Sequence, residues 1–233
     1  MFLALPTEIR LQIYELVLIC WRDKECILPD VSESRVTPLG FNNPKYTKIV
    51  PAVLQTCRQI YSEAIPILYS SNRFRFVGTT TASTFLVQIG PTNVKLLKSL
   101  SLGILPMSKV PVSDWLNLLD ALVTKATGLR SLEVVWVQAG PPTWRLDGTH
   151  GTHGDNVLFV HALAKFRHLK ELKIRGWYAK HWPSFLSEKL PGVQVVAVPG
   201  HSRANNGRPG INFEVLQRAT EHLDPREYDP NDT

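Results

Sequence analysis

Apolar residues recur at helical spacing near the N-terminus, in residues 5–18. One stripe contains Ile9, Ile13, Leu16, Val17 and Cys20, and a second contains Leu11, Tyr14 and Leu18. The spacing predicts a helix, and Glu8 suits the positive end of its dipole. A helix that is apolar on two faces is either sandwiched within its own protein or shared with a partner. The pattern leaves both alternatives open.

A second helical pattern, in residues 54–76, runs into a strand. Its apolar stripe consists of Val53, Cys57, Ile60, Tyr61, Ala64 and Leu68. This stripe predicts that Cys57 is a buried, inert thiol. Pro66 lies inside the pattern and predicts a kink or a break into two short helices. Phe74 and Phe76 alternate with polar residues, as in a strand with one buried face.

Beyond residue 78 a leucine pattern recurs four times, each time after a helical stretch. The four units are Leu97-x-x-Leu100-x-Leu102, Leu129-x-x-Leu132-x-Val134, Leu169-x-x-Leu172-x-Ile174 and Leu190-x-x-Val193-x-Val195. The preceding helical stretches are 81–89, 113–125, 156–166 and 182–189. Strands that alternate with helices predict an α/β fold, with a mainly parallel sheet and right-handed crossovers.

The same strands have a second face. If the leucine positions face the helices, the alternate positions point the other way. That face includes Glu133, Lys173, Arg175 and Trp177. Either another segment covers it or it is a partner surface. Our hypothesis is that these four residues contribute to substrate or partner recognition.

Two motifs in the first third of the chain carry a resemblance. LPTEIRLQIY at 5–14 and LQTCRQIYSEAIPILYSSNRF at 54–74 resemble the N-terminal module of a group of fungal F-box-like proteins of undefined function. The resemblance implies docking on the Skp-type adaptor of a cullin–RING ubiquitin ligase. Leu5, Pro6, Ile9 and Ile13 match the F-box positions L-P-x-E-I-x-x-x-I and are the expected adaptor-binding residues. Some thirty residues, 21–50, separate the two helices here, whereas an ordinary F-box is compact.

The repeated units resemble leucine-rich repeats, with irregular spacing and without the consensus asparagine. F-box proteins often carry such repeats as their substrate-binding half. We therefore divide the chain into an F-box-like helical module with a terminal strand at 1–77 and a leucine-rich-repeat-like layer at 78–200. Residues 201–233 are expected to form a loop, a helix at 212–223 and a frayed tail.

The composition excludes few classes of function. The 233 residues carry a net charge of +6, and 44% are hydrophobic. The apolar runs are too short to span a bilayer, and no signal peptide is expected, so we expect an intracellular protein, cytoplasmic or nuclear. Three unpatterned cysteines favour a reducing compartment.

Positive charge is concentrated in residues 165–189, which contain seven Lys or Arg and only two acidic residues. Trp177, Tyr178 and Trp182 lie within this stretch. Cations interleaved with aromatics can bind single-stranded nucleic acid. Spaced charges more often only solvate an element, so nucleic-acid binding ranks lower.

Few residues in the sequence suggest a metal site or a catalytic site. His150, His153 and Asp155 have metal-ligating side chains, but they lie in a Gly/Thr-rich loop that favours simple exposure. Neither a nucleophile elbow nor a phosphate-binding glycine loop occurs. We expect a non-enzymatic interaction protein with no cofactor and no metal site. Its expected partners are a Skp-type adaptor and a protein substrate, with no membrane partner. The alternative is a stand-alone interaction module without a ligase link.

Overall fold

The computed structural model describes residues 2–20, 25–27, 51–104, 111–136, 156–176, 178–199 and 224–227. Strands alternate with helices along most of this length. The strands are β1 (Glu25–Ile27), β2 (Arg73–Val77), β3 (Ser99–Ile104), β4 (Ser131–Trp136), β5 (Glu171–Gly176) and β6 (Gln194–Pro199). The helices are α1 (Thr7–Leu18), α2 (Arg58–Ser71), α3 (Thr79–Val94), α4 (Val112–Lys125), α5 (Val157–Leu163) and α6 (Trp182–Lys189), with the 3₁₀ turns η1 (Phe2–Ala4) and η2 (Pro51–Gln55).

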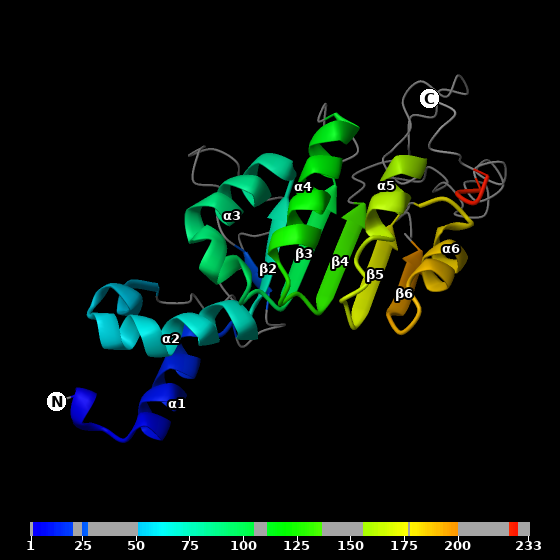
Figure 1. The fold of residues 1–233 in the computed structure, drawn as a ribbon. Coiled ribbons are helices and arrows are strands. Elements are labelled where there is room, and N and C mark those ends of the chain that lie inside the picture. The colour runs from blue at the N-terminus through cyan, green and yellow to red at the C-terminus, as the bar shows by residue number, and fades with distance from the viewer. Residues whose placement is uncertain are drawn as a thin grey trace, which may run out of the picture.

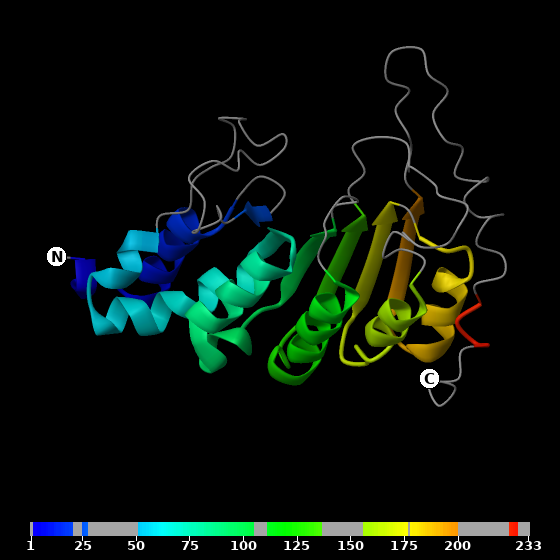
Figure 2. The same cartoon turned by 90° about the horizontal axis from the view of Figure 1, so that it is seen from above.

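The six strands form one parallel sheet in the order of the sequence, β1-β2-β3-β4-β5-β6. Each new strand is therefore added on the same side of the preceding one. Right-handed crossovers that always advance in one direction place their helices on one face of the sheet. Figures 1 and 2 show α3, α4, α5 and α6 lying side by side against that face. The predicted α/β fold of alternating helix–strand units is confirmed.

The leucine pattern forms the core between the sheet and these helices. Leu100, Leu132 and Leu172 are neighbours in the register of β3, β4 and β5, and all three are buried. The residues that open the four units, Leu97, Leu129, Leu169 and Leu190, are buried as well. On the helix side, α4 buries Trp115, Leu118, Leu119 and Leu122. The period-2 pattern thus assigned the inner face of the sheet correctly.

Two helices differ from the sequence-based prediction. α2 continues through Pro66 to Ser71, so the predicted break into two helices is wrong. The interruption occurs instead in α3, where Gly90 has φ 76° and precedes Pro91. A positive φ is accessible to glycine without the steric cost that a Cβ would bring. The helix that was expected at 81–89 therefore stops just before this point.

Cys57 also corrects a prediction. It is exposed and caps the N-terminus of α2, where its Sγ accepts a hydrogen bond from the Ile60 N–H at 3.5 Å. The apolar stripe of α2 begins at Ile60 and continues through Ala64 and Leu68, all buried. Tyr61, which was assigned to the same stripe, is exposed.

The sheet passes without interruption from β2 to β3, across the boundary drawn at 77/78. At the other end, a short turn at 224–227 docks beside α5 and α6. Arg226 forms an ion pair with Glu188 at 2.9 Å, and the Pro225 carbonyl oxygen lies 2.9 Å from Nε2 of His161. The helix expected at 212–223 lies outside the described residues.

Candidate functional site

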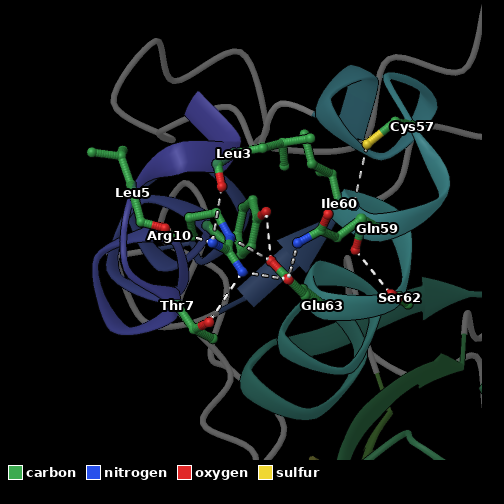
Figure 3. A network of polar contacts seen from close by, with 10 residues as sticks. Leu3, Leu5, Thr7, Arg10, Cys57, Gln59, Ile60, Ser62 and Glu63 are labelled. Carbon is green, nitrogen blue, oxygen red and sulfur yellow. Dashed lines mark hydrogen bonds and ion pairs between the residues drawn. The ribbon is translucent and has the colours of Figure 1, made fainter. Parts of the chain in front are cut away.

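Helix α1 is oriented by a polar cluster. The Arg10 guanidinium is buried and holds the Glu63 carboxylate of α2 through two hydrogen bonds, Nε to Oε2 at 2.9 Å and Nη2 to Oε1 at 2.7 Å (Figure 3). Nη1 of Arg10 also donates to the Leu5 carbonyl oxygen at 2.5 Å. The Tyr14 hydroxyl adds a third hydrogen bond to Glu63 at 3.0 Å. One side chain of α2 thus fixes α1 and the backbone that leads into it.

This cluster shifts the acid–base behaviour of its members. Hydrogen bonds from Arg10, and then from Gln59, lower the pKa of Glu63 from its usual 4.5 to about 2. The hydrogen bond to Glu63 raises the pKa of Arg10, and burial raises the pKa of Tyr14. Glu63 therefore stays ionised and Arg10 stays charged over the whole physiological pH range.

Asn72 fixes the other end of the two helices. Its Oδ1 accepts the Cys20 N–H at 2.8 Å, and its Nδ2 donates to the carbonyl oxygens of Leu18 and Leu68, both at 2.8 Å. The side chain is buried, and it joins the C-terminal ends of α1 and α2 at the start of β2. A fully satisfied buried amide of this kind is costly to replace.

Arg10, Tyr14 and Leu18 form the buried stripe of α1, and part of its other apolar stripe is exposed. Ile9 is 41% exposed and Leu16 is 64% exposed. Leu3 and Leu5 precede the helix and are exposed as well. We call five of the exposed apolar residues in and before α1 the α1 patch, namely Leu3, Leu5, Pro6, Ile9 and Leu16.

The four expected adaptor-binding residues fall in or beside this patch. Leu5, Pro6 and Ile9 are exposed, and Ile13 is half-buried at its border. Leu11 is also exposed, whereas Tyr14 is buried. Of the stripe that was predicted to contain Ile9, Ile13, Leu16, Val17 and Cys20, only Ile9 and Leu16 are exposed among the described residues. Ile13 and Val17 are half-buried, and Cys20 is buried.

A second cluster lies on the sheet face that no described helix covers (Figure 2). Glu133 of β4 is buried, and its carboxylate is surrounded by cations. Nη1 of Arg175 lies 3.4 Å from Oε1, Nζ of Lys173 lies 3.7 Å from the same oxygen, and Nη1 of Arg73 lies 3.9 Å from Oε2. Ser101 Oγ donates to Oε2 at 3.0 Å. We call these five residues the Glu133 cluster.

The parallel register explains why the cluster forms. Ser101, Glu133 and Lys173 are paired across β3, β4 and β5, so their side chains stand in one row on one face. Arg175 lies two residues further along β5. The structure therefore brings together three of the four proposed recognition residues, and Trp177 lies outside the described residues. Lys173 and Arg175 keep 29% and 48% of their side chains exposed.

No sequence pattern indicated that Glu63 would bind Arg10 or that Arg73 would join the Glu133 cluster. Arg10 and Glu63 are 53 positions apart, and no local pattern joins them. Arg73 reaches Glu133 across β3 although it had been assigned only to a strand. The amphipathic pattern of 54–76 did place Glu63 off the apolar stripe, and this was the only hint of its role.

The aromatic residues of the basic stretch 165–189 are not available for base stacking where the structure describes them. Tyr178 and Trp182 are buried with Trp136 and Phe159 beneath α5 and α6. The rings of Phe159 and Trp182 are stacked, with their centroids 6.3 Å apart. This finding removes the stacking contribution of both residues from the single-strand binding hypothesis.

The remaining candidate sites can be assessed only where the structure describes their residues. His150, His153 and Asp155 lie outside the described residues. Within the described ranges, no group of three or more His, Cys, Asp or Glu side chains is arranged to hold a metal ion. A search of the same ranges finds no helix with the length and apolar character needed to cross a membrane.

Comparison with known protein families gives a match. The family described as "Domain of unknown function (DUF7730)" matches residues 30–147, which is just over half of the chain. The match includes α2, β2, α3, β3, α4 and β4, and with them Glu63, Asn72 and Glu133. No curated protein and no solved structure matches the chain. The chain belongs to the DUF7730 family.

Proposed function

We propose that this protein is a non-enzymatic interaction protein, that its α1 patch binds a Skp-type adaptor, and that its Glu133 cluster binds a second protein. The observation that carries the proposal is the orientation of α1. Its polar Arg10 and Tyr14 point inwards, and its apolar Ile9 and Leu16 point outwards. Exposed apolar patches on soluble proteins mark interaction sites more often than not.

The Skp-type adaptor is the proposed occupant because Leu5, Pro6, Ile9 and Ile13 match F-box positions. Three of these residues are exposed at one surface. The Arg10–Glu63 pair keeps that surface in place without using the side chain of any of the four. In this proposal the structural and binding roles of α1 are carried by different residues.

The Glu133 cluster supports a second binding surface. Three cations surround one carboxylate, so the cluster carries a surplus of positive charge, and all three cations are partly exposed. A buried carboxylate that fixes cationic side chains reduces the entropy they lose on binding. The surface suits a partner with carboxylate or carbonyl oxygens.

A stand-alone interaction module without a ligase link is the second candidate. The half-burial of Ile13 and the packing of Val17 against the core favour it, because these residues then serve the fold. In that case the α1 patch binds another protein, and the Glu133 cluster keeps its role.

Co-expression with a Skp-type adaptor, followed by size-exclusion chromatography, tests the proposal. We expect co-elution with the wild-type chain and loss of co-elution with Ile9→Asp/Leu16→Asp, since these exposed positions tolerate a charge in the free protein. Val87→Asp is the matched control, because Val87 is an exposed apolar residue on α3, away from α1. If the wild-type chain is folded and does not co-elute, the adaptor proposal is overturned. The stand-alone module then becomes the leading candidate.

A further inference from the structure

The edge of the sheet at which β3, β4, β5 and β6 begin is rich in cations. Each of these strands is preceded by a short segment that begins at or just after a helix end, namely 95–98, 125–130, 164–170 and 189–193. Lysine and arginine account for eight residues of these four segments, and aspartate and glutamate for none. We call these eight residues the basic edge: Lys95, Lys98, Lys125, Arg130, Lys165, Arg167, Lys170 and Lys189.

The parallel topology assembles this edge from distant parts of the sequence. The Arg130 N–H donates to the Lys98 carbonyl oxygen at 2.9 Å, and the Lys170 N–H donates to the Arg130 carbonyl oxygen at 2.7 Å. The residues before β3, β4 and β5 therefore stand side by side, about 4.8 Å apart from one strand to the next. The edge lies at the lower end of the strands in Figure 1.

Part of this charge has a structural explanation. Lys125 and Lys189 lie in the last turns of α4 and α6, and Lys95 and Lys165 follow closely on the ends of α3 and α5. Cations are favoured there because the carbonyl end of a helix carries partial negative charge. Arg130 is held by the carbonyl oxygens of Leu129 and His168 at 3.0 and 3.2 Å.

Lys98, Arg167 and Lys170 are not explained in this way. Arg167 and Lys170 are exposed, and Lys98 is partly so. Within the described residues, only Lys165 and Lys189 of the basic edge form ion pairs, with Asp120 at 3.7 Å and Glu188 at 3.6 Å. Most of the positive charge of the edge is therefore available to an external anion.

The composition of the edge indicates the kind of anion. Protein–protein interfaces are depleted in lysine and enriched in aromatic residues. The four segments that carry the basic edge contain six lysines and one Phe, Tyr or Trp residue, Phe166, which is buried. Single-stranded nucleic acid is bound largely by stacking, and an anionic membrane is usually engaged by apolar side chains as well as by charge. An array of lysines without exposed aromatics matches a phosphodiester backbone, which is bound by charge alone.

From this geometry we infer that the basic edge binds the phosphate backbone of double-stranded nucleic acid without sequence preference. Three strand-to-strand intervals give the edge a length of about 14 Å, and phosphates of one strand follow each other every ~3.4 Å along the helix axis. The edge therefore contacts about four phosphates. This activity does not depend on adaptor binding by the α1 patch.

Fluorescence anisotropy with a labelled 20-base-pair duplex tests the inference on the full chain. With about four phosphates neutralised, log Kobs should fall with log[salt] with a slope of about −3.6. Lys125→Gln/Lys170→Gln should weaken binding equally for two unrelated duplex sequences and reduce the steepness of the slope by about 2. Arg58→Gln/Lys180→Gln is the matched control, because it removes the same charge from α2 and from the segment before α6. It should leave both quantities unchanged.

Four results would overturn the inference. The first three are the absence of duplex binding at 50 mM salt, equal loss of binding in the edge variant and the control variant, and tighter binding of poly-glutamate than of the duplex. The third result would assign the edge to an acidic protein segment. Vesicles of phosphatidylserine and phosphatidylcholine serve as a further probe, and tighter binding to them than to the duplex would equally reject a nucleic-acid site.

Discussion

Arg10 of α1 and Glu63 of α2 are joined by two hydrogen bonds, at 2.9 and 2.7 Å, although 53 positions separate them. The pair lies at the contact between the two helices, and Tyr14 completes it from the same face of α1. It therefore determines which stripe of α1 is buried. Charged pairs with this forked geometry give directional specificity as well as energy.

Glu63→Gln should lower the stability of the folded chain and change its response to acid. The pKa of Glu63 is about 2 in the folded state, below the usual 4.5, because Arg10 and Gln59 donate hydrogen bonds to it. The stabilisation from this carboxylate is therefore fully present above pH 4.5 and is lost as the pH falls towards 2. Melting temperatures recorded from pH 7 to pH 2 should fall more steeply below pH 4.5 for the wild type than for the variant.

The control for this prediction is Glu15→Gln, an exposed carboxylate on α1 that forms no ion pair with the described residues. Its melting temperature at pH 7 should match that of the wild type. Parallel acid profiles for wild type and Glu63→Gln would show that the Arg10–Glu63 pair does not couple proton binding to folding.

Asn72→Ala should destabilise the chain by about 2–4 kcal/mol, since it leaves the Cys20 N–H and the Leu18 and Leu68 carbonyl oxygens without their buried partner. Urea denaturation measures this loss. Asn93→Ala is the control, because Asn93 is only half-buried and its side chain donates to the Ile89 carbonyl oxygen at 3.0 Å and to the exposed Tyr61 hydroxyl at 3.4 Å. A cost for Asn72→Ala that is no larger than the cost for Asn93→Ala would contradict the role of Asn72 as the link between α1, α2 and β2.

The sequence predicted the repeating part of the fold well, for a physical reason. A period-2 apolar pattern such as Leu100/Leu102 can be buried only if the strand presents that face to a covering layer. Four such strands, each after a helix, leave few topologies open. The positions of β3, β4, β5 and β6 and of their helices could therefore be predicted from local information alone.

The interaction surfaces could be predicted only in part. Periodicity identified two apolar stripes on α1 but could not decide which of their residues are buried, because Arg10 and Tyr14 are held inside by Glu63 from a distant helix. Glu133, Lys173 and Arg175 were assigned to one face by alternation, and the register then explained their contact. Cys57 was misassigned because cysteine is apolar in a stripe but can also cap a helix through its sulfur.

Glu133→Gln tests whether the Glu133 cluster is held by its carboxylate. The substitution removes the charge that faces Arg73, Lys173 and Arg175, all of which are partly exposed and regain hydration. We therefore expect the free energy of unfolding to fall by about 1–2 kcal/mol, less than for the loss of a fully buried ion pair. Chemical denaturation measures it. Glu171→Gln, on the same face of β5, should cost less than about 0.5 kcal/mol. An equal loss of stability in the two variants would mean that Glu133 does not organise the cluster.

The close approach of successive units at the basic edge can be tested at Gly128. A Cβ built there would lie only 1.9 Å from the Lys95 carbonyl oxygen and 3.2 Å from that of Leu97. Both contacts are with backbone, so neither can be relieved by a side-chain rotation, and the segment before β4 has to separate from the segment before β3. Gly128→Ala should lower the free energy of unfolding by about 3 kcal/mol or more, at the upper end of the range for overpacking.

The matched substitution is Gly192→Ala in the segment before β6. Gly192 has φ +87°, but a Cβ there meets no atom within 4 Å, so only backbone strain of about 1–2 kcal/mol is expected. Comparing the two variants by urea denaturation separates a steric clash between units from a local conformational cost. A smaller loss for Gly128→Ala than for Gly192→Ala would mean that the backbone before β3 yields easily, and that the segments forming the basic edge are not rigidly packed against each other.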